Sequence, residues 1–327
     1  MGKLSWAMML QLGNKMWSKF EKDDFLTFDR EVWDKVVSAC AGAGVDTILL
    51  DLGEGMRFDT HPELAVKGSW TKNQMADEIA RLRNMGITLI PKLNFSATHD
   101  HWLGPWRYQL STPAYYKLCG ELIDEVWELF GTDWMHVGLD EESPYYQAGE
   151  PLVRCRQGEL WWHDAYYYID LCEKRGMRAA VWPSWCHDHP EEYVEKMPKS
   201  VIQTPYYYGD WWDDRPADIE KLKTLRPDQV ELVTHRFRAY RTLAENGYDI
   251  LSSGSNWSCD CNFSQLVDYC TRHTGENLRG FLQTPWIPTA KETGETVLRA
   301  VELLRDAKNG LLFEKAVSEI TDGTRFE

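Results

Sequence analysis

The sequence lacks the features that would place the protein in a membrane or on nucleic acid. No apolar run reaches the roughly 20 residues that a transmembrane helix needs. Acidic residues outnumber basic ones, 51 to 36, and the net charge of −15 disfavours nucleic acid and anionic membranes as partners. The segment Met1–Leu10 has no apolar core with a cleavage site. We therefore expect a cytoplasmic protein, or a secreted one whose leader is absent from this chain.

A glycine-rich phosphate loop, a linker and an internal repeat are also absent, so we expect one domain over residues 1–327 and no cofactor. Eight cysteines are scattered through this long chain. We expect them to be reduced, because a large core does not need disulfides for stability. The spacing of Cys259 and Cys261 fits neither the usual zinc pattern nor a usual disulfide, so we interpret this pair as structural.

A unit of helix, glycine and apolar strand recurs along the chain. Ala41–Gly44 precedes Val45–Asp51, and Asn84–Gly86 precedes Ile87–Asn94. Apolar strands that alternate with amphipathic helices are typical of a parallel sheet. We predict strands near residues 5–11, 46–51, 87–94, 133–139, 178–183, 200–205, 249–254 and 279–284. Eight such units favour an α/β fold that is a single (β/α)₈ TIM barrel; a doubly wound open sheet is the alternative.

Aromatic residues are abundant, with 16 Trp, 15 Tyr and 11 Phe, and many follow the predicted strands. Barrel enzymes place their sites at the carboxyl-terminal ends of the strands. Carboxylates, amides and aromatic rings at these positions suit a neutral ligand rich in hydroxyl groups. The candidate site residues are Gln11, Arg57, Asn94, His99, Asp140, Glu141, Trp182, Trp185, Tyr208, Asp210, Trp257 and Trp286.

One motif ends the fourth predicted strand. The run Met135–Glu142 (MHVGLDEE) resembles the His-x-Gly-Gly-Asp-Glu signature of glycoside hydrolase family 20, the β-N-acetylhexosaminidases. Further segments are similar to that family in the same order along the chain. They are Gly55–Arg57, Pro62–Leu64, Gly68–Trp70, Gly86–Pro91 and Tyr208–Asp210. The tryptophans Trp182, Trp185 and Trp286 occupy places where the family has tryptophan walls.

The resemblance implies an exo-acting, retaining hydrolase that releases a terminal β-linked N-acetylhexosamine. In that family the acetamido oxygen of the substrate attacks C1 and forms an oxazolinium ion, so no enzyme nucleophile is needed. By the motif match, Asp140 would hold the acetamido N–H. Glu141 would protonate the leaving oxygen and then activate water, and Tyr208 would hydrogen-bond the acetamido carbonyl.

The sequence also departs from that family. Leu139 replaces the second glycine of the motif, and Pro91–Asn94 lacks both acids of the third strand. The arginine of the first strand is missing, with Gln11 nearby and Arg57 as its candidate replacement. The additional N-terminal domain is absent too. The chain therefore looks more similar to small single-barrel β-N-acetylgalactosaminidases related to families 20 and 123, which favours N-acetylgalactosamine over N-acetylglucosamine.

The residues themselves leave alternatives open. Two adjacent carboxylates repel each other, which favours a raised pKa in one of them and suits a general acid. The triplet Asp140–Glu142 could instead be a solvated acidic loop. A retaining glycosidase could use Asp51, Glu54 or Asp210 as its nucleophile. A sugar-binding barrel without activity stays open, as does a homo-oligomer.

Two His-Asp-His runs, His99–His101 and His187–His189, could present imidazoles to a metal ion. Neither run has an obvious third and fourth ligand, so we predict no metal site. A metal-dependent barrel hydrolase is nevertheless the remaining alternative, and chelator sensitivity would reveal it.

Overall fold

The computed structural model describes residues 4–15, 24–212 and 216–312. Eight parallel strands form a closed barrel in chain order, as the sequence predicts. The strands are β1 (Ser5–Gln11), β2 (Thr47–Asp51), β3 (Thr88–Lys92), β4 (Trp134–His136), β5 (Arg178–Val181), β6 (Ile202–Gln203), β7 (Ile250–Gly254) and β8 (Leu278–Gln283). The fold is therefore a (β/α)₈ barrel, and the open-sheet alternative is wrong.

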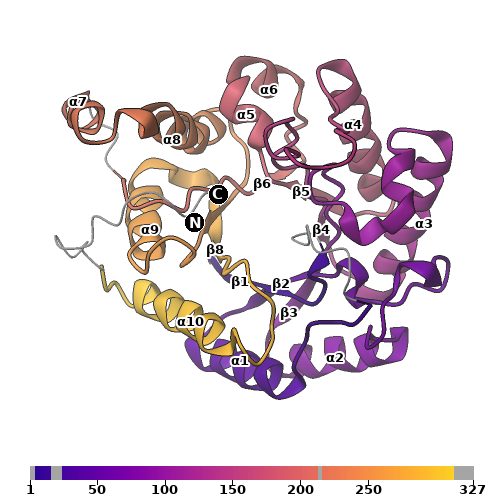
Figure 1. The fold of residues 1–327 in the computed structure, drawn as a ribbon. Helices are drawn as coiled ribbons and strands as arrows, with labels where there is room; N and C mark the ends of the chain where they lie inside the picture. Colours follow the sequence, from indigo (N-terminus) through magenta and orange to yellow (C-terminus); the bar gives the residue numbers. More distant parts are fainter. Residues whose placement is uncertain (1–3, 16–23, 213–215, 313–327) are drawn as a thin grey trace.

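Helices surround the barrel, and the last of them, α10, lies beside the first, α1 (Figure 1). The α-helices are α1 (Arg30–Ala43), α2 (Lys72–Asn84), α3 (Pro113–Phe130), α4 (Glu159–Glu173), α5 (Ser184–Asp188), α6 (Pro190–Lys196), α7 (Pro216–Leu225), α8 (Val230–Glu245), α9 (Asn262–His273) and α10 (Gly294–Lys308). None of the helices described has the length and apolarity that crossing a bilayer requires.

Local sequence signals explain where these helices begin and end. The hydroxyl of Thr112 caps α3 by accepting a hydrogen bond from the Tyr115 amide, and Pro113 occupies the first turn. Gly131 ends the same helix in the left-handed conformation, at φ 58°. The buried face of α3 includes Leu118 and Leu122, so the apolar period of the sequence faces the barrel as expected.

Alternating residues of the strands fill the barrel interior. An apolar layer joins Met9 on β1 to Leu49 on β2 and Ile90 on β3, which are neighbours in the strand register. One layer nearer the carboxyl-terminal end, the side chains become polar. Gln11, Asp51, Lys92 and His136 are register neighbours across the first four strands, and all are buried. The interior therefore changes from apolar to polar at the end where a barrel carries its site.

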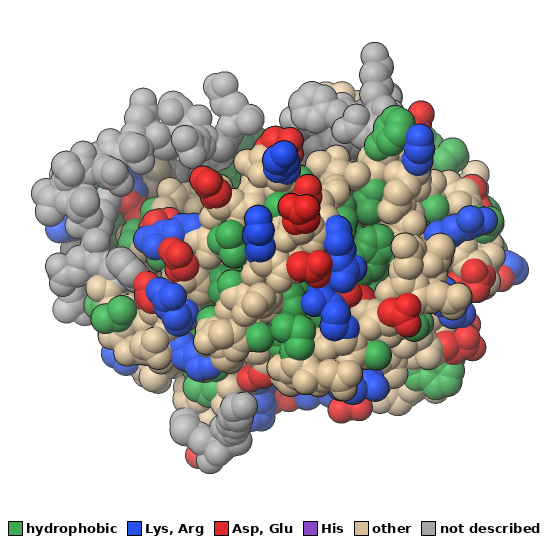
Figure 2. Space-filling model, turned by 90° about the horizontal axis from the view of Figure 1, so that it is seen from below, with side chains coloured by type: hydrophobic (Ala, Val, Ile, Leu, Met, Phe, Trp, Pro, Cys, Tyr) green, Lys and Arg blue, Asp and Glu red, His purple; other side chains and the backbone are tan. Residues whose placement is uncertain are grey.

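The outer surface carries charges of both signs. On the face shown in Figure 2, acidic and basic side chains are interspersed among polar and apolar ones, without a continuous basic area. This arrangement agrees with the net charge of −15 and offers no extended surface for a phosphate backbone on that face.

Candidate active site

His136 fixes the end of β4, where the motif begins. Burial, with the nearby charge of Lys92, lowers the pKa of His136 well below its ordinary value, so the ring is neutral. Its Nδ1 accepts a hydrogen bond from the Gly138 amide at 3.0 Å. The other nitrogen, Nε2, is therefore protonated and donates to the Thr204 hydroxyl at 2.9 Å. This histidine ties the turn after β4 to the chain after β6.

The backbone turns sharply between His136 and Glu142, which is why β4 is shorter than the predicted 133–139. Gly138, Leu139 and Glu141 all have positive φ, at 81°, 73° and 58°. A side chain at Gly138 would collide with Asn94, so this position requires glycine. Leu139 is non-glycine in a left-handed conformation, which costs free energy and is found mainly where function or packing imposes it.

This turn places Asp140 and Glu141 against residues that follow β3. The amide Nδ2 of Asn94 donates to Oδ1 of Asp140 at 3.0 Å. His99 Nε2 lies 3.4 Å from Oδ2 of Asp140 and 3.3 Å from Oε2 of Glu141. Asp140 is buried, whereas the Glu141 side chain keeps 22% of its surface exposed. Four predicted site residues therefore meet in one cluster, with Glu141 as its most accessible member.

The charges in this cluster are coupled. Burial favours a neutral His99, but the nearby charge of Asp140 and the contacts of Glu141 outweigh it and raise the pKa of His99 to about 9. Burial likewise raises the pKa of Glu141, yet His99, helped by Arg236, outweighs it and lowers that pKa below its ordinary value. The expectation that carboxylate repulsion raises the pKa of the acid is wrong for Glu141, because the histidine between the carboxylates is cationic.

Two of the three consecutive tyrosines after β6 face the barrel interior. The Tyr206 hydroxyl lies 2.7 Å from the Ser184 hydroxyl and donates to Glu141 at 3.5 Å. The Tyr208 ring stacks on Tyr206 at 5.5 Å between ring centroids. Tyr207 instead packs edge-on against Trp212 at 5.2 Å. The predicted catalytic residue Tyr208 is therefore in the aromatic layer, while Tyr206 is the tyrosine whose hydroxyl reaches Glu141.

Two tryptophans complete this aromatic layer. The rings of Trp182 and Trp286 lie 5.5 Å apart, and Trp286 also faces Tyr208 at 6.2 Å. The Lys92 ammonium lies over the Trp286 ring at 5.8 Å and forms a buried ion pair with Asp51. In the described part of the chain, the buried indole N–H of Trp182 has no hydrogen-bond partner. A ligand that offers an oxygen there would satisfy it.

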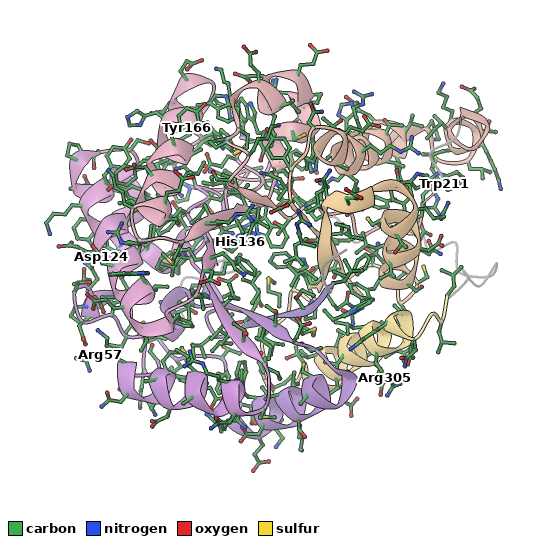
Figure 3. The ribbon with its side chains drawn as sticks, turned by 180° about the vertical axis from the view of Figure 1, so that it is seen from behind. Arg57, Asp124, His136, Tyr166, Trp211 and Arg305 are labelled. Atoms are coloured by element: carbon green, nitrogen blue, oxygen red, sulfur yellow. The ribbon has the colours of Figure 1, made fainter. Side chains whose placement is uncertain are left out.

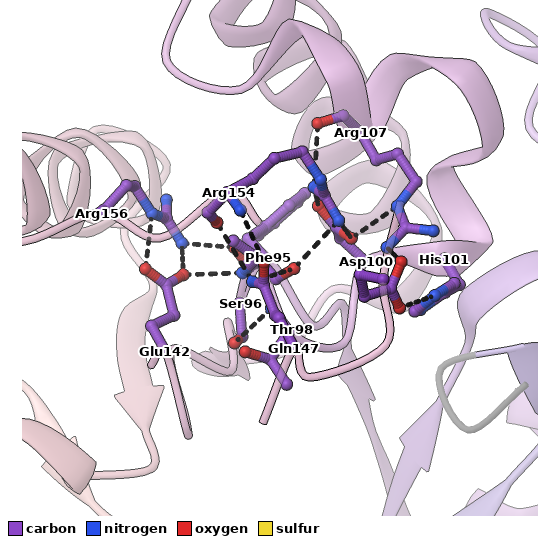
Figure 4. A network of polar contacts seen from close by, with 12 residues as sticks. Phe95, Ser96, Thr98, Asp100, His101, Arg107, Glu142, Gln147, Arg154 and Arg156 are labelled. Atoms are coloured by element: carbon purple, nitrogen blue, oxygen red, sulfur yellow. Dashed lines mark hydrogen bonds and ion pairs between the residues drawn. The ribbon is translucent and has the colours of Figure 1, made fainter. Parts of the chain in front are cut away.

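The third acid of the triplet has a different role. Glu142 is buried and forms an ion pair with Arg156, and its Oε1 accepts the Ala97 amide at 2.7 Å (Figure 4). Arg156 also contacts Asp164 at 3.1 Å. These bonds join the segment after β3 to the long connection after β4. The triplet is thus not a solvated acidic loop. Asp140 and Glu141 belong to the cluster, whereas Glu142 stabilises the backbone of the neighbouring segments through its contacts with Ala97 and Arg156.

Asp100, the middle residue of the first His-Asp-His run, has a similar structural role. It forms ion pairs with Arg154 at 2.7 Å and with Arg107 at 3.2 Å, while His101 contacts Glu150 at 2.7 Å (Figure 4). His101 therefore does not join His99 in the cluster. Asp100 and His101 are thus paired with other residues, and His99 is the member of this run that contacts Asp140 and Glu141.

Other predicted site residues lie apart from this cluster. Arg57 is exposed and lies at the edge of the molecule, whereas His136 is near its centre (Figure 3), so the structure does not bring Arg57 to the cluster. Trp185 stacks on Trp161 of α4 at 5.2 Å and its N–H donates to Glu192. These contacts make Trp185 part of the packing between helices.

The remaining three predicted site residues differ in their burial and contacts. Asp210 is partly buried and forms an ion pair with Arg226 at 2.8 Å. Trp257 follows β7 and is 41% exposed. Gln11 is buried at the end of β1, beside Asp51 in the register, so it belongs to the polar layer beneath the cluster.

The cluster also bears on metal binding. His99, Asp140 and Glu141 are the group of potential ligands found in the described residues, with ligand atoms within 4.8 Å of one another. Because the pKa of His99 is raised to about 9, a metal ion would have to displace a proton from this ring at neutral pH. In the second histidine run, His187 instead packs against the Tyr206 ring at 5.4 Å.

Sequence reasoning did not single out Arg236, a residue of α8. Its guanidinium lies over the Tyr206 ring at 4.5 Å, and its charge acts on Glu141 and Tyr208. The pattern of α8 contains several charged residues, and periodicity alone does not reveal which one faces the site. In the sequence, Lys92 is recognisable only as a departure from the acidic third strand of family 20. Its ion pair with Asp51 follows from the strand register, in which the two residues are neighbours.

Together, the (β/α)₈ barrel brings adjacent carboxylates and an aromatic layer to its carboxyl-terminal end, where barrel enzymes carry their sites. No family model matches the chain, and no curated protein matches it. Solved structures do match, among them several at 11 to 16% identity, and this likeness concerns the fold.

Three of these structures are hexosaminidases of which this chain spans about half to two thirds. A β-N-acetylhexosaminidase from Bacteroides fragilis NCTC 9343 is 13% identical with TM-score 0.59, over 92% of this chain and 65% of that one. A GH20 exo-β-N-acetylglucosaminidase from Vibrio harveyi is 14% identical with TM-score 0.63, over 93% and 54%. A Streptomyces plicatus β-hexosaminidase variant, in complex with the product GlcNAc, is 13% identical with TM-score 0.61, over 92% and 64%.

Proposed function

We propose that the protein is an exo-acting β-N-acetylhexosaminidase that works through the acetamido group of its substrate. The observation that carries this proposal is the cluster of Asp140, Glu141 and His99 at the end of β4. The fold likeness to solved hexosaminidases, and the motif that this cluster occupies, support the same reaction.

Asp140 suits the role of orienting the acetamido group. One of its oxygens accepts from Asn94 and the other faces His99, so the carboxylate is held in one orientation. A fixed, buried carboxylate can accept the acetamido N–H and stabilise the positive charge that develops as the oxazolinium ion forms. The amide oxygen of the substrate then attacks C1, the bond from C1 to the leaving oxygen breaks, and that oxygen takes a proton.

Glu141 and His99 together supply that proton. In the resting cluster the proton resides on His99, because its pKa is raised to about 9 while that of Glu141 is lowered. The 3.3 Å contact between them allows the proton to pass to Glu141 and then to the leaving oxygen. In the second half of the reaction, Glu141 removes a proton from the water that opens the oxazolinium ring.

The aromatic layer supports binding of the hexosamine ring. Trp182, Trp286 and Tyr208 offer apolar faces against which the C–H bonds of a sugar can pack. The Trp182 N–H provides an additional donor for a sugar oxygen. The preference for N-acetylgalactosamine over N-acetylglucosamine rests on the sequence likeness to the compact galactosaminidases.

A glycosidase with a protein nucleophile is the second candidate. It needs a second carboxylate within roughly 5 Å of the acid, across the anomeric carbon. Asp51 is engaged by Lys92 and Asp210 by Arg226. Glu54 accepts the Asn14 amide at 2.7 Å. Asp51 and Asp210 are thus engaged by cations, and Glu54 is held by its Oε1 atom, which favours substrate assistance.

Hydrolysis of p-nitrophenyl glycosides tests the proposal. The substrates are the β-N-acetylgalactosaminide, the β-N-acetylglucosaminide and the matching glycoside without an acetamido group, each with and without EDTA. We expect turnover of the acetamido sugars alone, loss of it in Glu141→Gln, and no effect of EDTA. Equal turnover of the sugar without the acetamido group would point to a protein nucleophile instead.

A further inference from the structure

Arg236 approaches the proposed acid from outside the barrel. It is a half-buried residue of α8, and its guanidinium covers the Tyr206 ring at 4.5 Å. The hydroxyl of that same tyrosine reaches Glu141. The ring of Tyr206 therefore lies between the Arg236 cation and Glu141, the carboxyl group that we propose protonates the leaving oxygen.

In the described part of the chain, this guanidinium has no carboxylate partner of its own. Among the side chains that the structure describes, no Asp or Glu oxygen lies within 4.0 Å of Arg236. Arg226, by contrast, is paired with Asp210 at 2.8 Å, and Arg156 with Glu142. Removing a cation from water without a carboxylate partner is costly, and an anionic group of a ligand would offset that cost.

A pair of exposed tyrosines lies in the connection that follows the acid. Tyr145 is 74% exposed and Tyr146 is 42% exposed, and their rings meet edge-on at 5.2 Å. Tyr146 is within electrostatic reach of both Glu141 and Arg236. Large aromatic residues at such exposure are typical of binding surfaces.

The direction of the substrate follows from the proposed roles. Asp140 is buried and holds the acetamido group, so the hexosamine occupies the inner part of the site. The leaving group must then extend from Glu141 toward solvent, where Tyr146 and Tyr145 are exposed. Arg236 covers the ring of Tyr206, whose hydroxyl reaches Glu141, so the guanidinium lies near the carboxyl group from which the leaving group extends.

We propose, on the basis of the function above, that Arg236 and Tyr146 form a subsite for a leaving-group sugar that carries an anion, a carboxylate or a sulfate. The guanidinium binds the anionic group and Tyr146 packs on the ring. An anion bound to Arg236 also offsets the charge that helps to keep Glu141 ionised, and so favours the protonated acid when the substrate is in place.

Kinetics with matched disaccharides test this subsite. The terminal β-N-acetylhexosamine is joined to a hexuronic acid, to a sulfated hexose or to the corresponding neutral hexose. We expect kcat/KM for one of the two anionic substrates to exceed that for the neutral one by about tenfold to a hundredfold, as a charge-assisted hydrogen bond provides. The preferred anion distinguishes carboxylate from sulfate, and the preference should shrink as salt is added.

Variants of two arginines on α8 distinguish a specific role of Arg236 from a general effect of removing a positive charge. Arg236→Gln should lower kcat/KM for the anionic substrate at least tenfold more than for the neutral one, and Arg236→Lys should restore part of the preference. Arg238→Gln is the matched control, since Arg238 is exposed on α8, and it should leave the preference intact. The wild-type preference and its salt dependence do not depend on any variant folding correctly.

Two outcomes would overturn the subsite. One is equal hydrolysis of neutral and anionic disaccharides by the wild-type protein. The other is an equal loss of both activities in Arg236→Gln, because Arg236 would then act on the hexosamine itself. If the wild type hydrolyses neither these disaccharides nor the p-nitrophenyl hexosaminides, the proposed function fails and the subsite with it.

Discussion

The Nε2 atom of His99 lies 3.3 Å from Oε2 of Glu141, and the histidine holds the proton that the proposed acid requires. The same nitrogen lies 3.4 Å from Asp140. A single imidazolium therefore bridges the two carboxylates and removes the repulsion that adjacent acids would otherwise feel. This relationship makes both the stability of the fold and the activity depend on pH in a predictable direction.

The stability of the protein should fall as pH rises from about 6.5 to about 9. His99 has its ordinary pKa of 6.5 in the unfolded chain and about 9 in the fold, so its contribution is complete below pH 6.5 and is lost by pH 9. The raised pKa corresponds to a loss on the order of 3 kcal/mol. Urea unfolding at pH 6.5 and pH 9 measures it. The decline should be smaller in His99→Asn and should persist in the exposed control His163→Asn.

Activity should also decline at alkaline pH as His99 loses its proton. Above pH 9 His99 is neutral and Glu141 has no proton donor, so kcat/KM should fall with an apparent pKa near 9. His99→Phe should lower kcat by roughly a hundredfold, the usual contribution of a positioned acid or base. A pH profile in which His99→Phe keeps the wild-type alkaline limb would show that another group is responsible.

Substitutions of the adjacent residues Glu141 and Glu142 should have different effects, one on activity and the other on stability. Glu142→Gln breaks a buried ion pair with Arg156 and leaves the arginine unpaired, which should destabilise the protein by about 3–5 kcal/mol. Glu141→Gln should abolish hydrolysis while changing the unfolding free energy by much less, because that side chain is partly exposed. Chemical denaturation and p-nitrophenyl assays on both variants test this division. Equal destabilisation by the two substitutions would contradict it.

The turn at Gly138 should not tolerate a side chain. Gly138→Ala imposes a left-handed alanine and pushes the new methyl group into Asn94, which would disturb the hydrogen bond to Asp140. Gly86→Ala is the matched control, since Gly86 has φ 78° but open space around it. The control should cost about 1 kcal/mol from backbone strain. Gly138→Ala should cost more and also lower kcat, and equal effects would refute the contact.

The indole N–H of Trp182 should contribute to substrate binding. Trp182→Phe keeps an aromatic ring in the layer but removes the unpartnered donor. Loss of one neutral hydrogen bond of about 1 kcal/mol should weaken binding of the hexosamine product about fivefold. Calorimetric titration with N-acetylhexosamine provides the measurement. Unchanged affinity in a correctly folded variant would show that the N–H does not contact the sugar.

Much of the fold follows from the sequence because its signals are local. Glycines that end helices before apolar runs indicate β2, β3, β5 and β7, and Thr112 with Pro113 indicates the start of α3. The motif also located Asp140 and Glu141, since parallel strands bring their carboxyl ends to one side of a barrel.

The rest depends on contacts across the chain that no local pattern reveals. Glu142 resembles its neighbours in sequence, and only its contact with Arg156 shows that it is structural. The pKa of Glu141 reverses its expected direction because His99 folds between the carboxylates. Arg57 faces outward and Arg236 inward, and helix α8 gives no periodic signal that distinguishes Arg236 from its charged neighbours.

The central claim, that the acetamido group of the substrate is the nucleophile, is tested most directly by weakening that nucleophile. We would compare p-nitrophenyl glycosides whose N-acetyl group carries one, two or three fluorine atoms in place of hydrogen. Fluorine withdraws electrons from the amide oxygen, so substrate assistance predicts that kcat falls steeply with each fluorine. A kcat that is insensitive to fluorination would contradict the account and assign the attack on C1 to a side chain of the protein.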